Sequence, residues 1–255
     1  MSRIQNAFTN KKAFIAFLTA GDPDFETSVK NFKAVIEAGA DLIEVGIPFS
    51  DPIAEGPVIQ EADIRALSSG MTTDKVFDLV AELRKESEVP IVLMTYANPV
   101  YHYGSERFFE KAAAAGADGI IIPDCPFEER HEFDEVAAAH GIDFISMIAP
   151  TSEDRIKTIA SQARGFIYVV SSLGVTGVRS EIKTDLASIL GLIKEAADTP
   201  AAIGFGISTP AQAEKMSKLA DGVIVGSAMV RIVAEHGSEA PAKLAEYVKG
   251  MKAVL

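Results

Sequence analysis

Short runs of apolar, often β-branched residues alternate along this chain with longer stretches whose apolar residues recur at helical spacing. Apolar runs of this length are typical of strands buried on both faces, as in a parallel sheet. The predicted strands are residues 14–18, 42–45, 91–95, 119–122, 143–147, 166–170, 201–204 and 222–225. The predicted helices are residues 25–38, 57–67, 75–85, 106–115, 128–140, 153–163, 184–197, 210–219 and about 239–251.

Eight alternating strand and helix units in 255 residues favour a closed (β/α)8 barrel, the TIM barrel, over an open doubly wound sheet. No linker, low-complexity tract or change of composition divides the chain, so we expect residues 1–255 to form one domain with extra short helices. The sequence Ala38-Gly39-Ala40-Asp41 recurs as Ala115-Gly116-Ala117-Asp118, and Ala220-Asp221 is a weaker echo. We interpret the repeat as mechanical, because glycine just past a helix supplies a left-handed cap.

In barrels of this kind the active site lies in the loops after the carboxyl ends of the strands. The seventh predicted strand is followed by residues 204–210 and the eighth by residues 226–230, and both segments carry small residues at a helix start. Backbone N–H groups at such glycine-rich starts bind anions, so we favour a phosphate site over ordinary tight turns. The second segment also predicts a short extra helix that ends near His236-Gly237.

The loop after the sixth predicted strand, residues 171–181, is long and contains several glycines. Its closeness to the phosphate turns favours a lid that closes over a ligand, with a plain surface loop as the alternative. Gly177 in this loop offers one more N–H donor to the anion.

Acidic residues gather at the second predicted strand and in the loop behind it. Glu44 is embedded in an apolar strand, where loss of hydration raises a carboxyl pKa toward values useful for proton transfer. A Glu paired with a lysine is the alternative. Asp51 and Glu55 follow in a loop restrained by three prolines and two glycines, where each is a candidate catalytic group or a turn or capping residue.

The sequence lacks the residues that Schiff-base, metal-dependent or thiol catalysis would need. No lysine ends a strand, so a Schiff-base aldolase has no nucleophile, and no histidine ends a strand beside a second metal-type ligand. Cys125, the one cysteine, has no histidine placed to activate it and rules out an internal disulfide. By elimination, we expect carboxylate acid/base chemistry on a phosphorylated substrate, with no metal.

Net charge and hydropathy indicate which partners and which cellular location to expect. The net charge of −12 gives no global attraction to nucleic acid or to an anionic membrane surface. The apolar run after Lys11-Lys12 is short for a secretory signal and leads into the turn Gly21-Asp22-Pro23, so we interpret it as the first strand. No later stretch reaches the roughly 20 apolar residues of a membrane helix, and we expect a soluble, cytoplasmic protein.

Five motifs resemble, in order, those of the α subunits of tryptophan synthase, and the resemblance covers essentially the whole chain. They are residues 18–23 (LTAGDP), 44–52 (EVGIPFSDP), 123–126 (PDCP), 174–177 (GVTG) and 204–208 (GFGIS). The resemblance implies cleavage of indole-3-glycerol phosphate to indole and glyceraldehyde 3-phosphate without a metal or an organic cofactor in this chain. A separate β subunit, expected in an αββα tetramer, would hold pyridoxal phosphate and use the indole.

The resemblance also implies roles for single residues. Glu44 matches the general acid/base, and Glu55 matches the second catalytic acid, where an aspartate is more usual in the family. Glutamate keeps the charge and adds one methylene. The positions that match the indole pocket, lid, phosphate cradle and β-subunit face are Phe17, Tyr96, Tyr168, Thr176, Gly177, Gly206, Gly226, Ser227, Asp51, Pro52, Ile53, Asn98 and Pro126.

The alternatives within enzymes are other phosphate-binding barrels, such as an indoleglycerol phosphate synthase or a sugar-phosphate isomerase. A non-enzymatic barrel that activates or scaffolds a partner is a second alternative, and a relative that releases free indole is a third. Both acidic positions and the phosphate cradle are present, which argues against an inactive scaffold.

Overall fold

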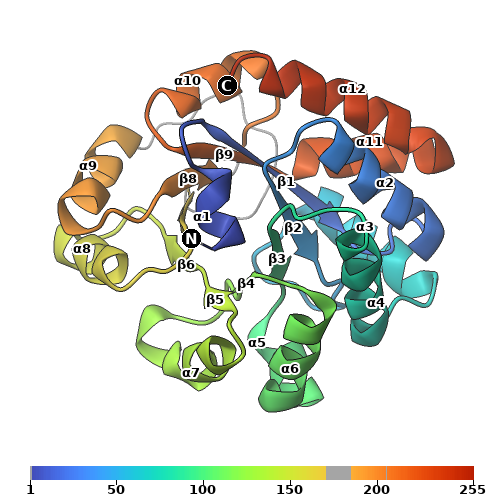
Figure 1. The fold of residues 1–255 in the computed structure, drawn as a ribbon, viewed down its shortest axis with the longest axis horizontal. Coiled ribbons are helices and arrows are strands. Elements are labelled where there is room, and N and C mark those ends of the chain that lie inside the picture. The colour runs from blue at the N-terminus through green and yellow to red at the C-terminus, as the bar shows by residue number, and fades with distance from the viewer. Residues whose placement is uncertain (1, 171–184, 205) are drawn as a thin grey trace.

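The computed structural model describes residues 2–170, 185–204 and 206–255. Its nine strands form one parallel sheet in the order β5-β4-β3-β2-β1-β9-β8-β7-β6, enclosed by helices (Figure 1). Strands β5 and β6 are two pieces of a single barrel strand on either side of Ile145, whose amide donates to the Ile120 carbonyl. The two ends of the sheet order therefore belong to the same strand, and the sheet is a TIM barrel.

All eight predicted strands are confirmed, and the fifth is the one that is divided. The strand bounds are β1 Ala13–Thr19, β2 Leu42–Gly46, β3 Ile91–Met94, β4 Gly119–Ile121, β5 Asp143–Phe144, β6 Ser146–Ile148, β7 Ile167–Val170, β8 Ala201–Gly204 and β9 Gly222–Val225. Every residue of β1, β2, β3, β7, β8 and β9 is buried, as expected for strands covered on both sides.

The helices match the periodic stretches, including the extra helix α11 that ends at His236. Their bounds are α1 Arg3–Ala7, α2 Phe25–Glu37, α3 Pro57–Ser68, α4 Thr73–Arg84, α5 Ala97–Tyr103, α6 Ser105–Ala115, α7 His131–Ala139, α8 Glu153–Ser161, α9 Leu186–Ala196, α10 Pro210–Ser217, α11 Ser227–His236 and α12 Ala240–Lys252, with short 3₁₀ turns η1 Phe127–Glu129 and η2 Gly237–Glu239. No helix in the described ranges is long and apolar enough to cross a membrane.

Three features depart from the sequence expectation. Helices α1 and α5 were not predicted, and the expected helix over 128–140 divides into η1 and α7. Asn98, which the resemblance places on the partner face, is exposed and lies in the first turn of α5. Pro99 is compatible with that turn, because the first N–H groups of a helix have no partner within it.

The repeated Ala-Gly-Ala-Asp motif connects neighbouring strands at their amino ends. Gly39 and Gly116 have positive φ angles of 106° and 98°, which confirms the left-handed caps. The aspartate of each copy adds a role that the sequence did not predict. The carboxylates of Asp41, Asp118 and Asp221 accept hydrogen bonds from the backbone N–H groups of Phe14, Ile91 and Ala201, each at the start of a neighbouring strand.

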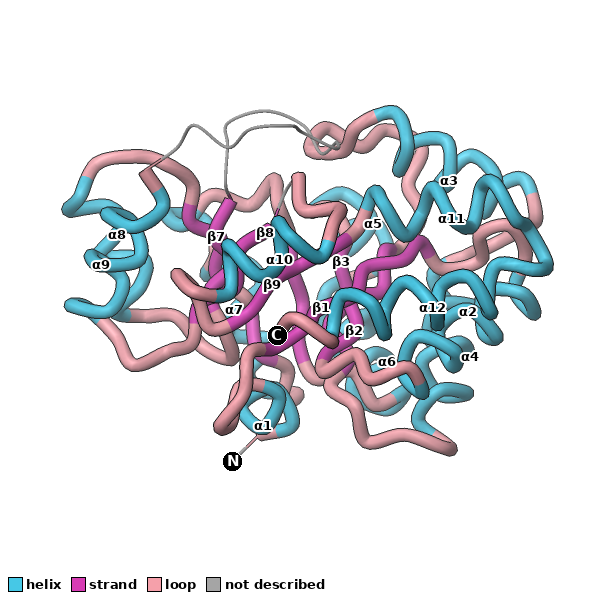
Figure 2. Tube along the Cα trace, turned by 90° about the horizontal axis from the view of Figure 1, so that it is seen from above, coloured by secondary structure: helices cyan, strands magenta, loops and turns pink. Residues whose placement is uncertain are grey.

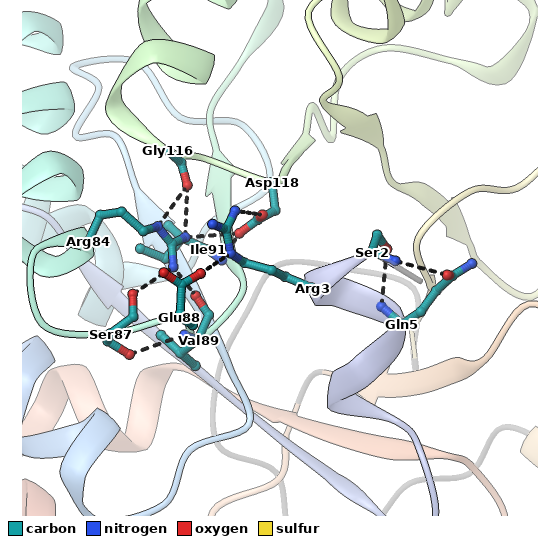
Figure 3. Close-up of polar contacts among 10 residues, drawn as sticks. All are labelled: Ser2, Arg3, Gln5, Arg84, Ser87, Glu88, Val89, Ile91, Gly116 and Asp118. Carbon is teal, nitrogen blue, oxygen red and sulfur yellow. Dashed lines mark hydrogen bonds and ion pairs between the residues drawn. The ribbon is translucent and has the colours of Figure 1, made fainter.

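Helix α1 covers the amino end of the barrel, where it lies below the strands in Figure 2. Ser2 and Gln5 form its capping box, and Arg3 pairs with Asp118 at 3.0 Å and with Glu88 at 2.6 Å (Figure 3). Arg84, at the end of α4, also pairs with Asp118 and donates to the carbonyl groups of Gly116, Ser87 and Val89. Asp118 thus joins α1, α4 and the start of β3, at the end of the barrel opposite to the candidate site.

Candidate active site

Glu44 lies in the middle of β2, beside Phe17 of β1, and its side chain is 1% exposed. Its Oε1 atom has no hydrogen-bond partner within the described ranges, and no ion pair there involves this carboxyl group. The lysine pairing left open by the sequence is therefore not observed among these residues. Burial raises the pKa of Glu44 to about 8, so the side chain is mostly protonated at neutral pH.

Tyr168 of β7 is buried near Glu44, and both burial and the Glu44 charge raise the pKa of its hydroxyl group. Gly204, at the end of β8, leaves space for this ring, because a Cβ atom there would lie 2.3 Å from the Tyr168 Oη. Gly46 does the same for Phe17, whose ring would be 2.7 Å from an added Cβ. The sequence did not single out these space-making roles, although both glycines end strands.

Glu55 lies just before α3 and is 6% exposed, close to Tyr96, the N-cap of α5. The Tyr96 hydroxyl accepts the Ala54 N–H at 3.1 Å and hydrogen-bonds to Glu55. Asp63 of α3 also hydrogen-bonds to Glu55, a contact that the sequence did not predict. Burial raises the pKa of Glu55, whereas the hydrogen bonds from Asp63 and Tyr96 act in the opposite direction.

An ion pair between the buried Asp22 and the partly exposed Arg65 holds α3 against the loop after β1. Asp22 is 3% exposed and accepts two hydrogen bonds from Arg65, at 2.7 and 2.9 Å. Burial raises the pKa of Asp22 and the Arg65 guanidinium lowers it. Such a bidentate pair fixes orientation as well as charge, so it sets the position of the helix that carries Asp63.

The glycine-rich turns expected to bind phosphate follow β8 and β9. Gly206 has a φ of 86°, in the region that favours glycine. Gly226 is the N-cap of α11, Ser227 is its first residue, and no side chain among the described residues caps this helix. The start of α11 is therefore suited to an anion. Thr176 and Gly177 lie outside the described residues, as does the loop expected to act as a lid.

The positions expected to face a partner lie on two adjoining segments. Asp51 and Ile53 are exposed in the loop before α3, Ile53 by 70%, and Pro52 is partly buried between them. The bond from Ala54 to Tyr96 links this loop to the start of α5, where Asn98 is exposed. Tyr101 of α5 adds a 79% exposed aromatic side chain that the sequence did not single out.

Two further expectations concern reactive groups. Cys125 is partly buried, and burial together with nearby acidic groups raises the pKa of its thiol to about 11, which disfavours the nucleophilic thiolate. Within the described ranges, no group of three or more His, Cys, Asp or Glu side chains is arranged to hold a metal ion.

Comparison with known proteins identifies the family. The family model "Tryptophan synthase alpha chain" matches residues 4–254. The tryptophan synthase alpha chain of Lacticaseibacillus casei is 50% identical over 252 residues, which are 99% of this chain and 95% of that protein. The alpha chain of Lactiplantibacillus plantarum is 51% identical and covers 100% of this chain and 97% of its own length.

Solved structures agree with these relatives. The Mycobacterium tuberculosis tryptophan synthase structure has a TM-score of 0.90 at 34% identity, covering 99% of this chain and 98% of that one. A tryptophan synthase complex from Pyrococcus furiosus has a TM-score of 0.86 at 40% identity, covering 94% and 97%. With a family match over nearly every residue and relatives of the same length at half identity, the chain belongs to the tryptophan synthase alpha chain family.

Proposed function

We propose that Glu44 and Glu55 are the two catalytic carboxyl groups of this chain. The family reaction, and the function of this chain, is the cleavage of indole-3-glycerol phosphate to indole and glyceraldehyde 3-phosphate by a carbon–carbon lyase. The observation that carries the assignment is Glu44, a fully buried carboxyl group without an ion-pair partner in the described ranges and with a pKa raised to about 8.

Glu44 is suited to act first as an acid and then as a base. In its protonated form it donates a proton to the indole carbon that carries the glycerol side chain, which makes the ring iminium-like. The resulting carboxylate then takes the proton of the adjacent glycerol hydroxyl. As that oxygen becomes the aldehyde oxygen, the carbon–carbon bond breaks and its electron pair returns to the ring, which releases indole and leaves Glu44 protonated.

Glu55 is suited to act on the ring nitrogen. An ionised carboxylate that accepts the indole N–H stabilises the positive charge that develops when the ring is protonated. The hydrogen bonds from Tyr96 and Asp63 favour this ionised form in spite of burial. The two groups therefore divide the work, with Glu44 transferring the proton and Glu55 stabilising charge.

Aromatic side chains around these acids form the proposed indole site. Phe17 lies beside Glu44, Tyr168 lies near it, and Tyr96 bonds to Glu55, so all three surround the positions where the ring would react. We assign Thr176 to the lid that orients the acids on closure.

We assign the substrate phosphate to the glycine-rich turns. Gly206, Gly226 and Ser227 provide backbone N–H groups at the turn after β8 and at the uncapped start of α11. Gly177 of the lid supplies a further donor in this proposal. The phosphate would anchor the substrate at one side of the barrel while the ring reaches the acids.

The partner proposed for this chain is a tryptophan synthase β subunit, in an αββα tetramer. Structural neighbours include a tryptophan synthase complex, which supports a β-subunit partner. We assign the contact face to Asp51, Pro52, Ile53 and Asn98, with Pro126 beside them. This chain needs no cofactor of its own in the proposal, because pyridoxal phosphate belongs to the β subunit, and we keep a cytoplasmic location as part of it.

The test is indole release from indole-3-glycerol phosphate by the purified chain, with and without a β subunit. Glu44→Gln is expected to bind substrate and lose about 10²- to 10⁴-fold in kcat, because proton transfer contributes about that much. Glu55→Gln should also lose most turnover, and Glu55→Asp should report the effect of the extra methylene. Glu61→Gln, the same change at an exposed position of α3, is the control and should match wild type.

Near-normal turnover of Glu44→Gln would overturn its assignment. An unchanged rate on addition of β subunit would contradict coupling between the partner and closure of the lid. Free indole in the medium during turnover of the complex would favour release over direct transfer between subunits. Phosphate binding without any cleavage would instead point to another phosphate-binding barrel or to a scaffold.

A further inference from the structure

We propose that Asp63 is a positioning residue for the reaction, and that it donates a hydrogen bond, as a neutral carboxylic acid, to the carboxylate of Glu55. The proposal rests on the catalytic role proposed for Glu55. It adds a second carboxyl group behind the catalytic one, contributed by the helix that follows the catalytic loop.

Asp63 lies on the buried face of α3, where a charged side chain is rare unless it has a partner. The buried residues of α3 are Ile59, Ala62, Asp63 and Ala66, so Asp63 lies in the apolar stripe that faces the barrel and is 4% exposed. An ionised carboxylate in such a place loses its hydration, which costs several kcal/mol unless a partner replaces the water. The immediate partner is another acid, Glu55.

Two buried oxygen atoms identify where a proton is needed. The Oε2 atom of Glu55 and the Oδ2 atom of Asp63 are both buried, and neither has a donor within the described ranges. The two carboxyl groups nevertheless lie within reach of a hydrogen bond to each other. Two ionised carboxylates have no hydrogen to share, and their charges repel. One proton held between them gives each side chain a hydrogen bond and leaves the pair with a single negative charge.

The surroundings determine which group keeps that proton. Glu55 receives a hydrogen bond from the Tyr96 hydroxyl, which favours its charged form. Burial is the main cause that raises the pKa of Asp63, and the charge of Glu55 adds to it, with a small further effect from Asp22. A hydrogen bond from the Phe49 backbone N–H acts in the opposite direction. Arg65, the nearby cation, is bound by both oxygens of Asp22.

Within the described ranges, helix α11 and strand β1, the elements that pack most closely against α3, bring no charge to this pair. Helix α11 packs against α3, and its titratable residues Arg231, Glu235 and His236 are all exposed. Strand β1, which also contacts α3, has no ionisable side chain. The proton therefore remains on Asp63, and Glu55 remains ionised and is held in place by two donors.

The experiment compares Asp63→Asn with Asp63→Leu in the complex with β subunit, using indole release as a function of pH. The asparagine amide still donates to Glu55 and has no charge, so kcat should stay within about threefold of wild type. Leucine removes the donor, and kcat should fall about tenfold or more with little change in KM, because the lost interaction acts on the transition state. Asp78→Asn, the same change at an exposed position of α4, is the matched control.

The pH profile separates this role from a merely structural one. Without the Asp63 donor, only the Tyr96 hydroxyl still opposes the effect of burial. The pKa of Glu55 therefore rises, and the acid limb of kcat for Asp63→Leu should move upward by about one pH unit. The acid limb of Asp63→Asn should stay near that of wild type. Asp63→Ala removes the donor without adding apolar bulk and must shift the limb in the same direction, which covers the case in which the leucine variant does not fold.

Three outcomes decide the proposal. A wild-type pH profile for the folded leucine or alanine variant would overturn it, and so would an asparagine variant as impaired as the leucine one. Full activity of Glu55→Gln would instead overturn the proposed role of Glu55 itself, so the two failures are distinct.

Discussion

The burial of Glu44 links its proposed role in the reaction to the stability of the fold. Its pKa of about 8 places the proton where an acid working near neutral pH needs it, and burial is the cause of that value. The same burial makes the charged form unfavourable in the folded protein. The residue should therefore be visible in stability measurements as well as in turnover.

We predict that Glu44→Gln stabilises the protein at alkaline pH. The folded-state pKa of about 8 lies above the ordinary value of 4.5, so between these values the folded protein binds one more proton than the unfolded chain. Stability accordingly falls as pH rises through this window, by up to about 1.4 kcal/mol per unit. Urea unfolding should show Glu44→Gln to be several kcal/mol more stable than wild type at about pH 8, with little difference near pH 4.5.

Glu61→Gln, an exposed change of the same kind, should show no such dependence on pH. A stability difference between Glu44→Gln and wild type that is the same at both pH values would mean that the folded-state pKa of Glu44 is not raised. If Glu44→Gln lost turnover but its stability gain did not depend on pH, Glu44 would be needed for catalysis without having a raised pKa.

Gly204 gives a second prediction at the scale of one residue. A methyl group there would lie 2.3 Å from the Tyr168 Oη and 2.5 Å from its ring, so the tyrosine would have to move. We expect Gly204→Ala to lower kcat/KM by about tenfold or more, since small displacements of reacting groups are costly. Gly191→Ala in α9 is the control, because nothing lies within 4 Å of its added Cβ and alanine favours a helix. Equal activity of the two variants would contradict the role of Gly204.

At the scale of elements, periodicity predicted every barrel strand, because both faces of each strand are covered and its apolar run is continuous. The pattern could not predict the break at Ile145. The run Ile142 to Ile148 is apolar apart from Asp143 and Ser146, and nothing in it marks Ile145 as the point where the strand divides. Helices α1 and α5 are too short for a helical period to be recognised, since they have 5 and 7 residues.

The candidate site was predictable in part, for physical reasons. A glutamate inside an apolar strand indicates a buried carboxyl group, and the structure confirms the burial and raised pKa of Glu44. Asp63 gave no such signal, because it lies beside Ile64 and a helix pattern favours the isoleucine as the buried residue. The structure reverses this preference, with Ile64 63% exposed and Asp63 4% exposed. The burial of Asp63 in place of Ile64 is explained by the position of Glu55 in three dimensions, which the sequence pattern does not contain.

The aspartates at the amino ends of the strands should differ in how much each contributes to the stability of the fold. Asp118 accepts the Ile91 N–H and pairs with the largely buried Arg84, whereas Asp221 bonds to the Ala201 N–H without an ion pair in the described ranges. We expect Asp118→Ala to cost about 3–5 kcal/mol, because Arg84 is left unpaired, and Asp221→Ala about 1–3 kcal/mol. Chemical denaturation measures both, and turnover should be unchanged. Equal costs would show that the ion pair adds nothing.

At the scale of the whole molecule, the loop before α3 contains both Glu55, the proposed second catalytic acid, and the proposed partner face. Only one residue separates Ile53 from Glu55. We predict that Ile53→Asp weakens binding of a β subunit by about tenfold or more, because a charge would replace a 70% exposed apolar side chain at the interface. Isothermal titration calorimetry checks this, with Ile64→Asp on exposed α3 surface as the control. Equal weakening by both would contradict a face centred on the loop.

The division of the fifth barrel strand into β5 and β6 is a weak point in the strand pairing of the barrel. Strand β5 pairs with β4 through two residues, whereas β1 and β2 pair through five. The strand order puts β1, which carries Phe17, farthest from the break, with β2 and Glu44 beside it. Local opening should therefore begin around Ile145, and deuterium should enter those amides before it reaches β1 and β2. The strands that carry Phe17 and Glu44 can then stay paired while the opposite side of the barrel opens.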